Sequence, residues 1–283
     1  MYRLTLENEF HSQIELTGHE DKWQVTNVTG LNPPPAVIST SVIPNFDGER
    51  FNASRLDKRN IVISFVINGN VERNRTKLYS TIFPKRYIKV YYKTPLKNVY
   101  IEGYVESFEC DNFSQKCVGQ ISIICPKPYF MATEASTVKF NSVIDLFTFP
   151  FSLPKEGIAI SEMVNTQTNS VINYGSVETG IEIEIEASHN VVNPSVMNLS
   201  TGETMTIMQE LNGGDRILIG TNQGNKYVKL DCNCVETNLI NSLTNDSKWI
   251  RLIPGENRFS YSAAYGVENI DLTIKHRDLF GGV

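Results

Sequence analysis

The sequence lacks any apolar run that approaches the roughly 18 to 20 residues needed to span a bilayer. Residues 1–7 alternate polar and apolar types, whereas a secretory signal requires a basic start and an unbroken apolar stretch. Cysteine is scarce and odd in number, with five in 283 residues, unlike the paired disulfide framework of a small secreted domain. We therefore expect no membrane insertion, no export signal and assembly in a reducing cytoplasm.

The sequence also lacks the common catalytic motifs. Its four histidines include no His-x-x-x-His pair, the arrangement that places two zinc ligands on one helix face. It contains no Gly-x-Ser-x-Gly nucleophile turn and no Gly-x-x-x-x-Gly-Lys phosphate loop. We predict that the protein is not an enzyme, with no catalytic, cofactor-binding or metal-binding residues and no cofactor. The histidines are His11, His19, His189 and His276.

Charge is distributed unevenly along the chain. Residues 50–97 carry 12 Lys/Arg against 2 Asp/Glu, whereas residues 134–283 carry 10 against 18. Segments of opposite sign indicate two surfaces with different partners. The basic residues are interleaved with tyrosines that could stack on bases, but they are spread over a predicted loop, helix and strands instead of forming one stripe. We predict no specific nucleic-acid binding, and expect the tyrosines to pack on a sheet or against a neighbouring subunit. These are Tyr87, Tyr91, Tyr92, Tyr100 and Tyr104.

Strand signals dominate the first half of the chain. Residues 61–67 are mostly apolar and β-branched, and an Asn-Gly-Asn turn follows them. One short helix is predicted over about 72–83, because the apolar residues from Leu78 to Phe83 have the spacing of one helical face and Pro84 follows. Further strands are predicted at 87–92, 99–110 and 118–125.

A domain boundary is predicted at 126–141, where prolines and small polar residues replace the strand pattern. Residues 1–133 are assigned to a β-barrel or β-sandwich domain with the one helix, and residues 134–283 to an all-β sandwich or barrel. In the second domain, residues 181–187 alternate apolar and acidic types, which gives one buried and one solvated face. The last residues, from about 271, are a secondary candidate for packing back on the first domain.

Two close thiols form a candidate metal site. Cys232 and Cys234 are two residues apart, and close thiols bind soft metals. On a strand, however, they share one apolar face with Val228 and Leu230. We therefore interpret them as free thiols that point into the core of the second domain.

The row of Glu182, Glu184 and Glu186 is a second candidate for binding a cation. Calcium ligands come mostly from bent loops, whereas these glutamates lie on a straight strand. We interpret them as a solvated acidic face that guards the sheet against association.

A series of local patterns runs through both domains and nearly the whole chain. In the first domain it includes Asn45-Phe46-Asp47-Gly48-Glu49, Arg59-Asn60-Ile61, Asn74-Arg75 with Leu78-Tyr79, Ile101-Glu102-Gly103-Tyr104, and residues 121–130. In the second it includes Asn173-Tyr174-Gly175, Ile181-Glu182-Ile183, Asn193-Pro194, residues 199–203, Trp249-Ile250, residues 252–257 and Tyr265-Gly266-Val267. In this order the patterns resemble the siphophage distal tail protein family.

The resemblance implies a ring-forming N-terminal β domain that assembles into a hexamer and carries a galectin-like β-sandwich. It implies a structural hub of a bacteriophage tail tip or baseplate, which joins the tail tube protein to a tail-tip hub or tail-fibre protein and to receptor-binding proteins. The location implied is the virion tail tip, after assembly in the host cytoplasm. Galectin-type sugar binding is not implied, because Ser195 stands where an arginine would follow the proline.

The stretch 31–60 contains Pro33-Pro34-Pro35 and a long polar run, which suits an arm that reaches a neighbouring subunit. We therefore expect the first domain to form the ring, with its basic face against acidic residues of the next copy. Those acidic residues are Glu7, Glu9, Glu15, Glu20 and Asp21.

The main alternative function is a β-sandwich carbohydrate-binding or adhesin module. Trp23, Trp249 and many tyrosines lie on predicted β-structure, where such modules place the rings that stack on sugars. A ring in solution favours the hub, whereas a monomer favours the module.

Overall fold

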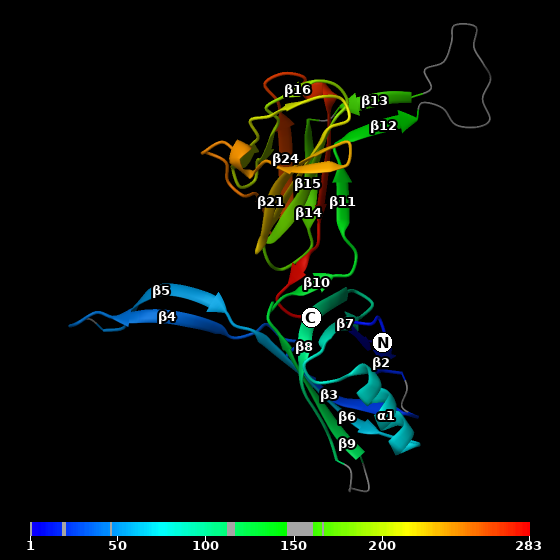
Figure 1. Cartoon of the computed structure of the whole chain (residues 1–283). Coiled ribbons are helices and arrows are strands. Elements are labelled where there is room, and N and C mark those ends of the chain that lie inside the picture. Colours follow the sequence, from blue (N-terminus) through cyan, green and yellow to red (C-terminus); the bar gives the residue numbers. More distant parts are fainter. Residues whose placement is uncertain (1, 19–20, 46, 112–116, 146–160, 166) are drawn as a thin grey trace, which may run out of the picture. The chain divides into compact units, whose positions relative to one another are not determined.

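The computed structural model describes residues 2–18, 21–45, 47–111, 117–145, 161–165 and 167–283 (Figure 1). The chain divides into unit 1, Met1–Thr133 with Leu279–Val283, and unit 2, Glu134–Asp278. Each unit has its own hydrophobic core. None of the helices in the described ranges is long and apolar enough to cross a membrane.

Unit 1 is built on one antiparallel sheet in the order β2-β1-β7-β8-β9-β6-β3. A short strand, β10, pairs with β8 on one side and with the C-terminal strand β26 on the other. Alternate residues of β6 and β9, such as Ile63 and Ile121, are completely buried, since successive side chains of a strand point to opposite faces. The strands are β1 (Arg3–Asn8), β2 (Gln13–Glu15), β3 (Trp23–Thr29), β6 (Arg59–Ile67), β7 (Tyr87–Lys93), β8 (Asn98–Cys110), β9 (Cys117–Cys125), β10 (Phe130–Ala132) and β26 (Leu279–Phe280).

The helix α1 spans Val71–Thr81 and packs on unit 1 beside β2 and β6. It ends two residues before its predicted end, because Pro84 disfavours helical geometry at Phe83, and Ile82 is already extended. Of the predicted apolar face, Leu78 and Ile82 are buried. The rest of that face, including Phe83, is exposed.

Unit 2 contains a large sheet in the order β11-β25-β15-β20-β21-β22 and a smaller sheet in the order β14-β24-β17-β18. Buried apolar residues of both sheets, such as Ile183 and Phe259, form one core, the arrangement of a β-sandwich. The large sheet consists of β11 (Ser136–Lys139), β15 (Thr179–Ala187), β20 (Arg216–Asn222), β21 (Asn225–Cys232), β22 (Val235–Asn238) and β25 (Ile270–His276), with β23 (Arg251–Leu252) paired to β15. The smaller sheet consists of β14 (Thr168–Asn173), β17 (Ser195–Asn198), β18 (Glu203–Thr206) and β24 (Gly255–Ser262).

Short elements complete unit 2. The strands β12 (Asn141–Asp145) and β13 (Ser161–Asn165) pair with each other, as do β16 (Val191–Val192) and β19 (Glu210–Leu211). Two single 3₁₀ turns, η1 (Ile240–Ser242) and η2 (Val267–Asn269), are the helical elements of the described part of this unit.

The segment 126–141 differs from its prediction. Strand content does not lapse there, because β10 and β11 both lie within it. β10 belongs to the sheet of unit 1 and β11 to that of unit 2, so the chain changes units between two short strands. The returning C-terminal segment is also shorter than expected, since β25 remains in unit 2 and Leu279–Val283 joins unit 1.

Candidate interaction site: an exposed hairpin arm

The stretch predicted to be an arm forms a two-stranded hairpin, β4 (Ala36–Val42) paired with β5 (Glu49–Leu56). Figure 1 shows this hairpin projecting away from the sheet of unit 1. In the described part of the chain, β4 and β5 pair with each other alone. Every described residue from 36 to 55 is exposed.

The register of the hairpin makes it amphipathic. Ile38 lies opposite Ser54 and Thr40 opposite Phe51, so that Asn52 is the extra residue of a β-bulge. Residues opposite each other across an antiparallel pair share a face. The apolar face therefore carries Ala36, Ile38, Thr40, Val42, Glu49, Phe51, Ser54 and Leu56. The polar face carries Val37, Ser39, Ser41, Arg50, Ala53 and Arg55.

The apolar face is large for a surface in contact with water. Ile38 is 62% exposed, Val42 74% and Phe51 60%. A two-stranded hairpin without a covering layer is marginally stable in water, and burying each of these side chains stabilises by about 1.5–3 kcal/mol. The arm therefore has the composition of an interface element.

The root of the arm is fixed by Arg59, the first residue of β6, which is 2% exposed. Its Nε donates to the carbonyl of Pro128 at 2.8 Å, and its Nη1 donates to the carbonyls of Gly30 and Asn32. Its Nη2 donates to the carbonyl of Gly281. Burial lowers the pKa of Arg59 from its ordinary value, because the charged form loses water. One guanidinium thus joins β6 to three segments that are far apart in the sequence.

The C-terminal residues pack against the same root. The N–H of Val283 donates to the carbonyl of Leu31 at 3.1 Å. A Cβ at Gly282 would lie 2.7 Å from the ring of Pro33, so this close approach requires glycine. The ring of Phe130 stacks against the guanidinium of Arg59, whose Cζ is 4.7 Å from its centroid. The arm therefore leaves unit 1 from a rigid base.

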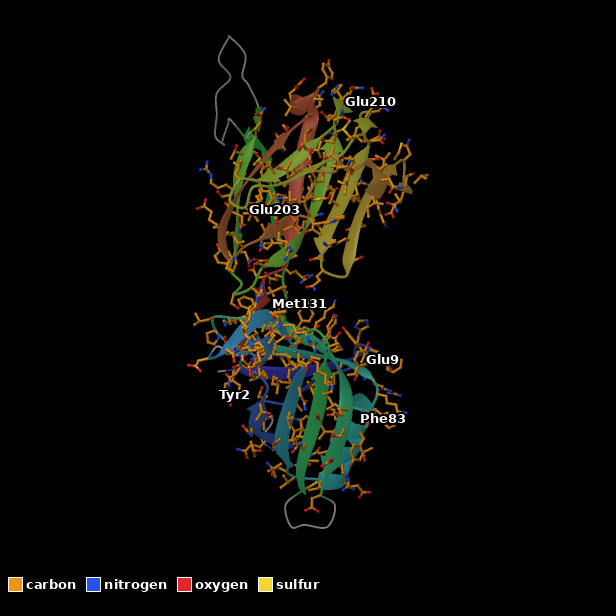
Figure 2. The ribbon with its side chains drawn as sticks, turned by 90° about the vertical axis from the view of Figure 1, so that its left-hand side faces the viewer. Tyr2, Glu9, Phe83, Met131, Glu203 and Glu210 are labelled. Atoms are coloured by element: carbon orange, nitrogen blue, oxygen red, sulfur yellow. The ribbon has the colours of Figure 1, made fainter. Side chains whose placement is uncertain are left out.

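A second exposed patch of unit 1 lies beside the end of α1. Arg86 lies over the rings of Phe10 and Phe83, at 5.4 and 5.3 Å from their centroids, and pairs with Glu9 at 3.6 Å. Figure 2 shows Glu9 and Phe83 on the same side of the unit. Phe10 is 68% exposed. Of the exposed half of the predicted helix face, this cation–aromatic cluster includes Phe83, whereas Tyr79 packs against Phe108.

Three of the five acidic residues expected to meet the basic face have partners within the chain. Glu7 is buried, and its carboxylate accepts from Gln13. Glu9 pairs with Arg86, and Glu15 pairs with Arg3 at 3.7 Å. Glu20, like His19, lies outside the described residues.

The tyrosines of the basic segment form cross-strand pairs on β7 and β8. Tyr91 lies against Tyr100 with ring centroids 5.7 Å apart, and Tyr87 lies against Tyr104 at 6.0 Å. Burial and a hydrogen bond to Glu102 raise the pKa of Tyr87, so its hydroxyl stays protonated. These rings pack on the sheet, one of the two arrangements expected.

The thiols Cys232 and Cys234 do not point into the core, and that prediction was wrong. β21 ends at Cys232, which is half-buried, and Cys234 is exposed. Asn233 and Cys234 have φ of 51° and 64°, which marks a two-residue type I′ hairpin turn. The strand alternation that placed both thiols beside Val228 therefore ends at Cys232 and does not apply to Cys234. Both thiols are free.

The acidic row on β15 is solvated, as predicted. Glu182 and Glu186 are exposed, and half-buried Glu184 pairs with Lys275 at 3.0 Å and with Arg216 at 3.6 Å. Within the described ranges, no group of three or more His, Cys, Asp or Glu side chains is arranged to hold a metal ion.

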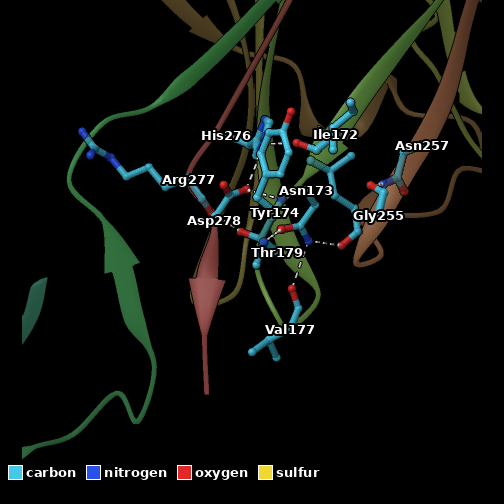
Figure 3. Close-up of polar contacts among 12 residues, drawn as sticks. Ile172, Asn173, Tyr174, Val177, Thr179, Gly255, Asn257, His276, Arg277 and Asp278 are labelled. Carbon is cyan, nitrogen blue, oxygen red and sulfur yellow. Dashed lines mark hydrogen bonds and ion pairs between the residues drawn. The ribbon is translucent and has the colours of Figure 1, made fainter. Parts of the chain in front are cut away.

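A buried polar cluster joins β14, β15 and β25 of unit 2 (Figure 3). The Nε2 of His276 lies 3.2 Å from both the carbonyl of Ile172 and the carboxylate of Asp278. Both neighbours are acceptors, so Nε2 carries the proton. Asp278 also accepts from the N–H of Tyr174, and Thr179 donates to the carbonyl of Arg277. These bonds hold strand ends together and form no open site.

The tryptophans do not form a sugar platform. Trp23 is 2% exposed and donates from its indole to the carbonyl of Glu15 at 3.0 Å. Trp249 packs partly buried against the core of unit 2, with Lys226 over its ring at 5.1 Å.

Two family models of phage tail proteins together match most of the chain. Residues 12–125 match a family model described as a phage tail protein RIFT-related domain. Residues 174–278 match a model described as a siphovirus-type tail component, C-terminal domain. A search of curated proteins gave no match.

Solved structures share the fold at low sequence identity. The Dit protein of phage SPP1, described as a paradigm of the hub adsorption apparatus in phages infecting Gram-positive bacteria, is 15% identical with a TM-score of 0.67. The match covers 98% of this chain and 99% of that one. A chain of the phage P2 baseplate in its activated conformation with Ca is 10% identical with a TM-score of 0.49, over 98% of each chain.

Proposed function

The chain belongs to the siphovirus distal tail protein family, and from this premise we propose that it assembles into a hexameric hub ring at the tip of a phage tail. Membership of this family gives a structural role in a tail or baseplate. The proposal adds the ring, its subunit number and its neighbours. The tail tube protein would lie on one side of the ring, and a tail-tip hub or tail-fibre protein and receptor-binding proteins on the other. Assembly would take place in the host cytoplasm.

The exposed arm is the observation that carries the proposal. It presents an apolar face on one side of a hairpin that leaves unit 1 from a rigid base. A surface that is not complementary to itself binds a different surface of the next copy, and such heterologous contacts close into a ring when the rotation allows. Unit 1, which carries the arm, is therefore the ring-forming unit, and unit 2 is the galectin-like sandwich attached to it.

Apolar burial, and not charge, supplies most of the ring contact in this proposal. The acids first expected to oppose the basic face, Glu7, Glu9 and Glu15, already have partners within the chain. The remaining basic side chains of the arm, Arg50 and Arg55, would set orientation more than affinity.

The oligomeric state of the full chain tests the proposal. Size-exclusion chromatography with light scattering should give the mass of six copies, and negative-stain microscopy should show closed rings. A monomer at every accessible concentration would contradict the hub and would favour a free-standing sugar-binding or adhesin module.

A matched pair of arm variants tests which face makes the contact. Ile38 and Val37 are adjacent, β-branched and exposed, but they lie on opposite faces of β4. Ile38→Lys should place a charge in the buried contact and convert the ring to monomers. Val37→Lys should leave the ring intact, because the polar face stays in water. Equal effects of both substitutions would show that the arm does not bind through its apolar face.

A further inference from the structure

Two thiols at the loop end of the β8–β9 hairpin of unit 1 lie unusually close together. Cys110 is the last residue of β8 and Cys117 the first residue of β9, and their sulfurs are 2.8 Å apart. Cys110 lies opposite Gly119 in the register, so Cys117 is its diagonal neighbour on the same face. A disulfide bond has an S–S distance of about 2.05 Å, so only a small movement separates the two thiols from a bond.

The surroundings single out this pair among the five cysteines. Cys117 is buried and Cys110 half-buried. The rings of Tyr79 from α1 and Phe108 from β8 make an edge-to-face contact, with their centroids 4.8 Å apart. Cys125 is a completely buried free thiol. Cys110 keeps the partial exposure that an external reagent needs.

We propose that Cys110 and Cys117 form a redox-sensitive disulfide that ties the ends of β8 and β9 together in the ring-forming unit. Both thiols are free in a reducing medium, and the bond forms when the protein meets a disulfide oxidant such as oxidised glutathione. The Cys110 thiolate attacks the glutathione disulfide, which gives a mixed disulfide and one glutathione thiolate. Cys117 loses its proton and displaces the second glutathione, so two thiols are oxidised and one external disulfide is reduced to two thiols.

The electrostatics predict how the exchange depends on pH. Burial, followed by the hydrogen bond and charge of Cys117, raises the pKa of Cys110 to about 12, while Arg75 opposes the shift. At neutral pH the attacking thiolate is therefore scarce. Well below the pKa its population, and with it the initial rate, rises about tenfold for each pH unit.

The test uses the full chain with Cys232→Ser and Cys234→Ser, which removes the other close pair. The reduced protein is incubated with oxidised glutathione at about pH 8.5, blocked with a maleimide and digested for peptide mass mapping. The expected product links Cys110 to Cys117, with Cys125 still reduced. The thermal midpoint of unit 1 should rise by roughly 5 °C on oxidation and return on reduction.

A single variant distinguishes a failure of the two thiols to meet from a failure of the chain to fold. With Cys117→Ser there is no resolving thiol, so glutathione should remain on Cys110 as a stable mixed disulfide and the midpoint should not rise. A link between Cys110 and Cys125 would overturn the proposal. The proposal would also be overturned by a folded chain in which glutathione bonds to Cys110 but Cys117 never displaces it.

Discussion

The guanidinium of Arg59 donates to four main-chain carbonyls, two from the segment before the arm, one from the loop before β10 and one from the C-terminal segment. Its position requires a planar group with several donors in a fixed arrangement, which lysine cannot supply. Arg59 is also buried against Phe130, so its replacement removes packing as well as hydrogen bonds. The residue holds the arm without being part of it.

Arg59→Met is expected to destabilise unit 1 by about 3 kcal/mol, because several buried carbonyls lose their donor. Arg59→Lys should recover less than half of that loss, since one ammonium cannot reach all four acceptors. Urea denaturation measures the free energy of unfolding of both variants. Arg50→Met on the exposed arm is the control and should change the free energy of unfolding of the isolated subunit by less than about 0.5 kcal/mol. A loss of similar size at both positions would show that charge, not geometry, matters.

Cysteine reactivity in the native state should follow exposure. Cys234 is exposed in its turn, whereas a hydrogen bond to Asp215 raises the pKa of half-buried Cys232. Burial raises the pKa of Cys125 to about 12, and its side chain is sealed in the core. A brief treatment with a maleimide should therefore label Cys234 first, then Cys232, and leave Cys125 unmodified. Mass spectrometry of the digested protein measures the order, and early labelling of Cys125 would contradict the packing described for β9.

At the scale of single elements, the β21–β22 hairpin shows how a turn overrides strand alternation. Its two loop residues need φ > 0, which asparagine tolerates and cysteine tolerates poorly. Once the chain turns, side chains beyond it follow a new register. The pattern of Val228, Leu230 and Cys232 could therefore not place Cys234.

Cys234→Gly is expected to stabilise unit 2 by about 1 kcal/mol, because glycine adopts the left-handed conformation without a Cβ penalty. Cys234→Ala keeps the Cβ and should give little gain, so it serves as the matched control. The midpoint of chemical denaturation measures both variants. If alanine and glycine stabilise equally, removal of the thiol is the cause and the turn geometry is not.

At the scale of the whole molecule, two separate hydrophobic cores predict two unfolding transitions. Phe259→Ala, in the core of unit 2, should lower one midpoint, and Arg59→Met should lower the other. Calorimetry of the full chain measures the two unfolding midpoints. A single transition that moves with either variant would show that the units unfold together.

The division of the chain also predicts what a fragment of unit 1 needs. Residues 1–133 alone lack β26, which pairs with β10, and the carbonyl of Gly281 that Arg59 uses. Because Met131 lies opposite Leu279, a turn of two to four residues (about the usual hairpin length) can join Thr133 to Leu279–Val283. The joined fragment should be more stable than residues 1–133 by about 3 kcal/mol in urea. The same fragment with Leu279→Ser and Phe280→Ser is the control and should lose most of that gain.

The sequence alone determined the features that depend on local periodicity. The alternation in 181–187, the β-branched run of β6 and the helical spacing before Pro84 each predicted an element of the right type. The proline-rich start of the arm also marked a segment without a core of its own. Period-two and helical spacing report which face an element buries, and that information lies within a few consecutive residues.

Only the tertiary structure decided how distant segments meet. The role of Arg59 depends on carbonyls at residues 30, 32, 128 and 281, and no local pattern relates these positions. The amphipathic character of the arm depends on the bulge at Asn52, which sets which residues of β5 share a face with β4. The approach of Cys110 to Cys117 depends on the register of β8 with β9. Register, closure and burial arise from packing over the whole chain, so a single residue type cannot reveal them.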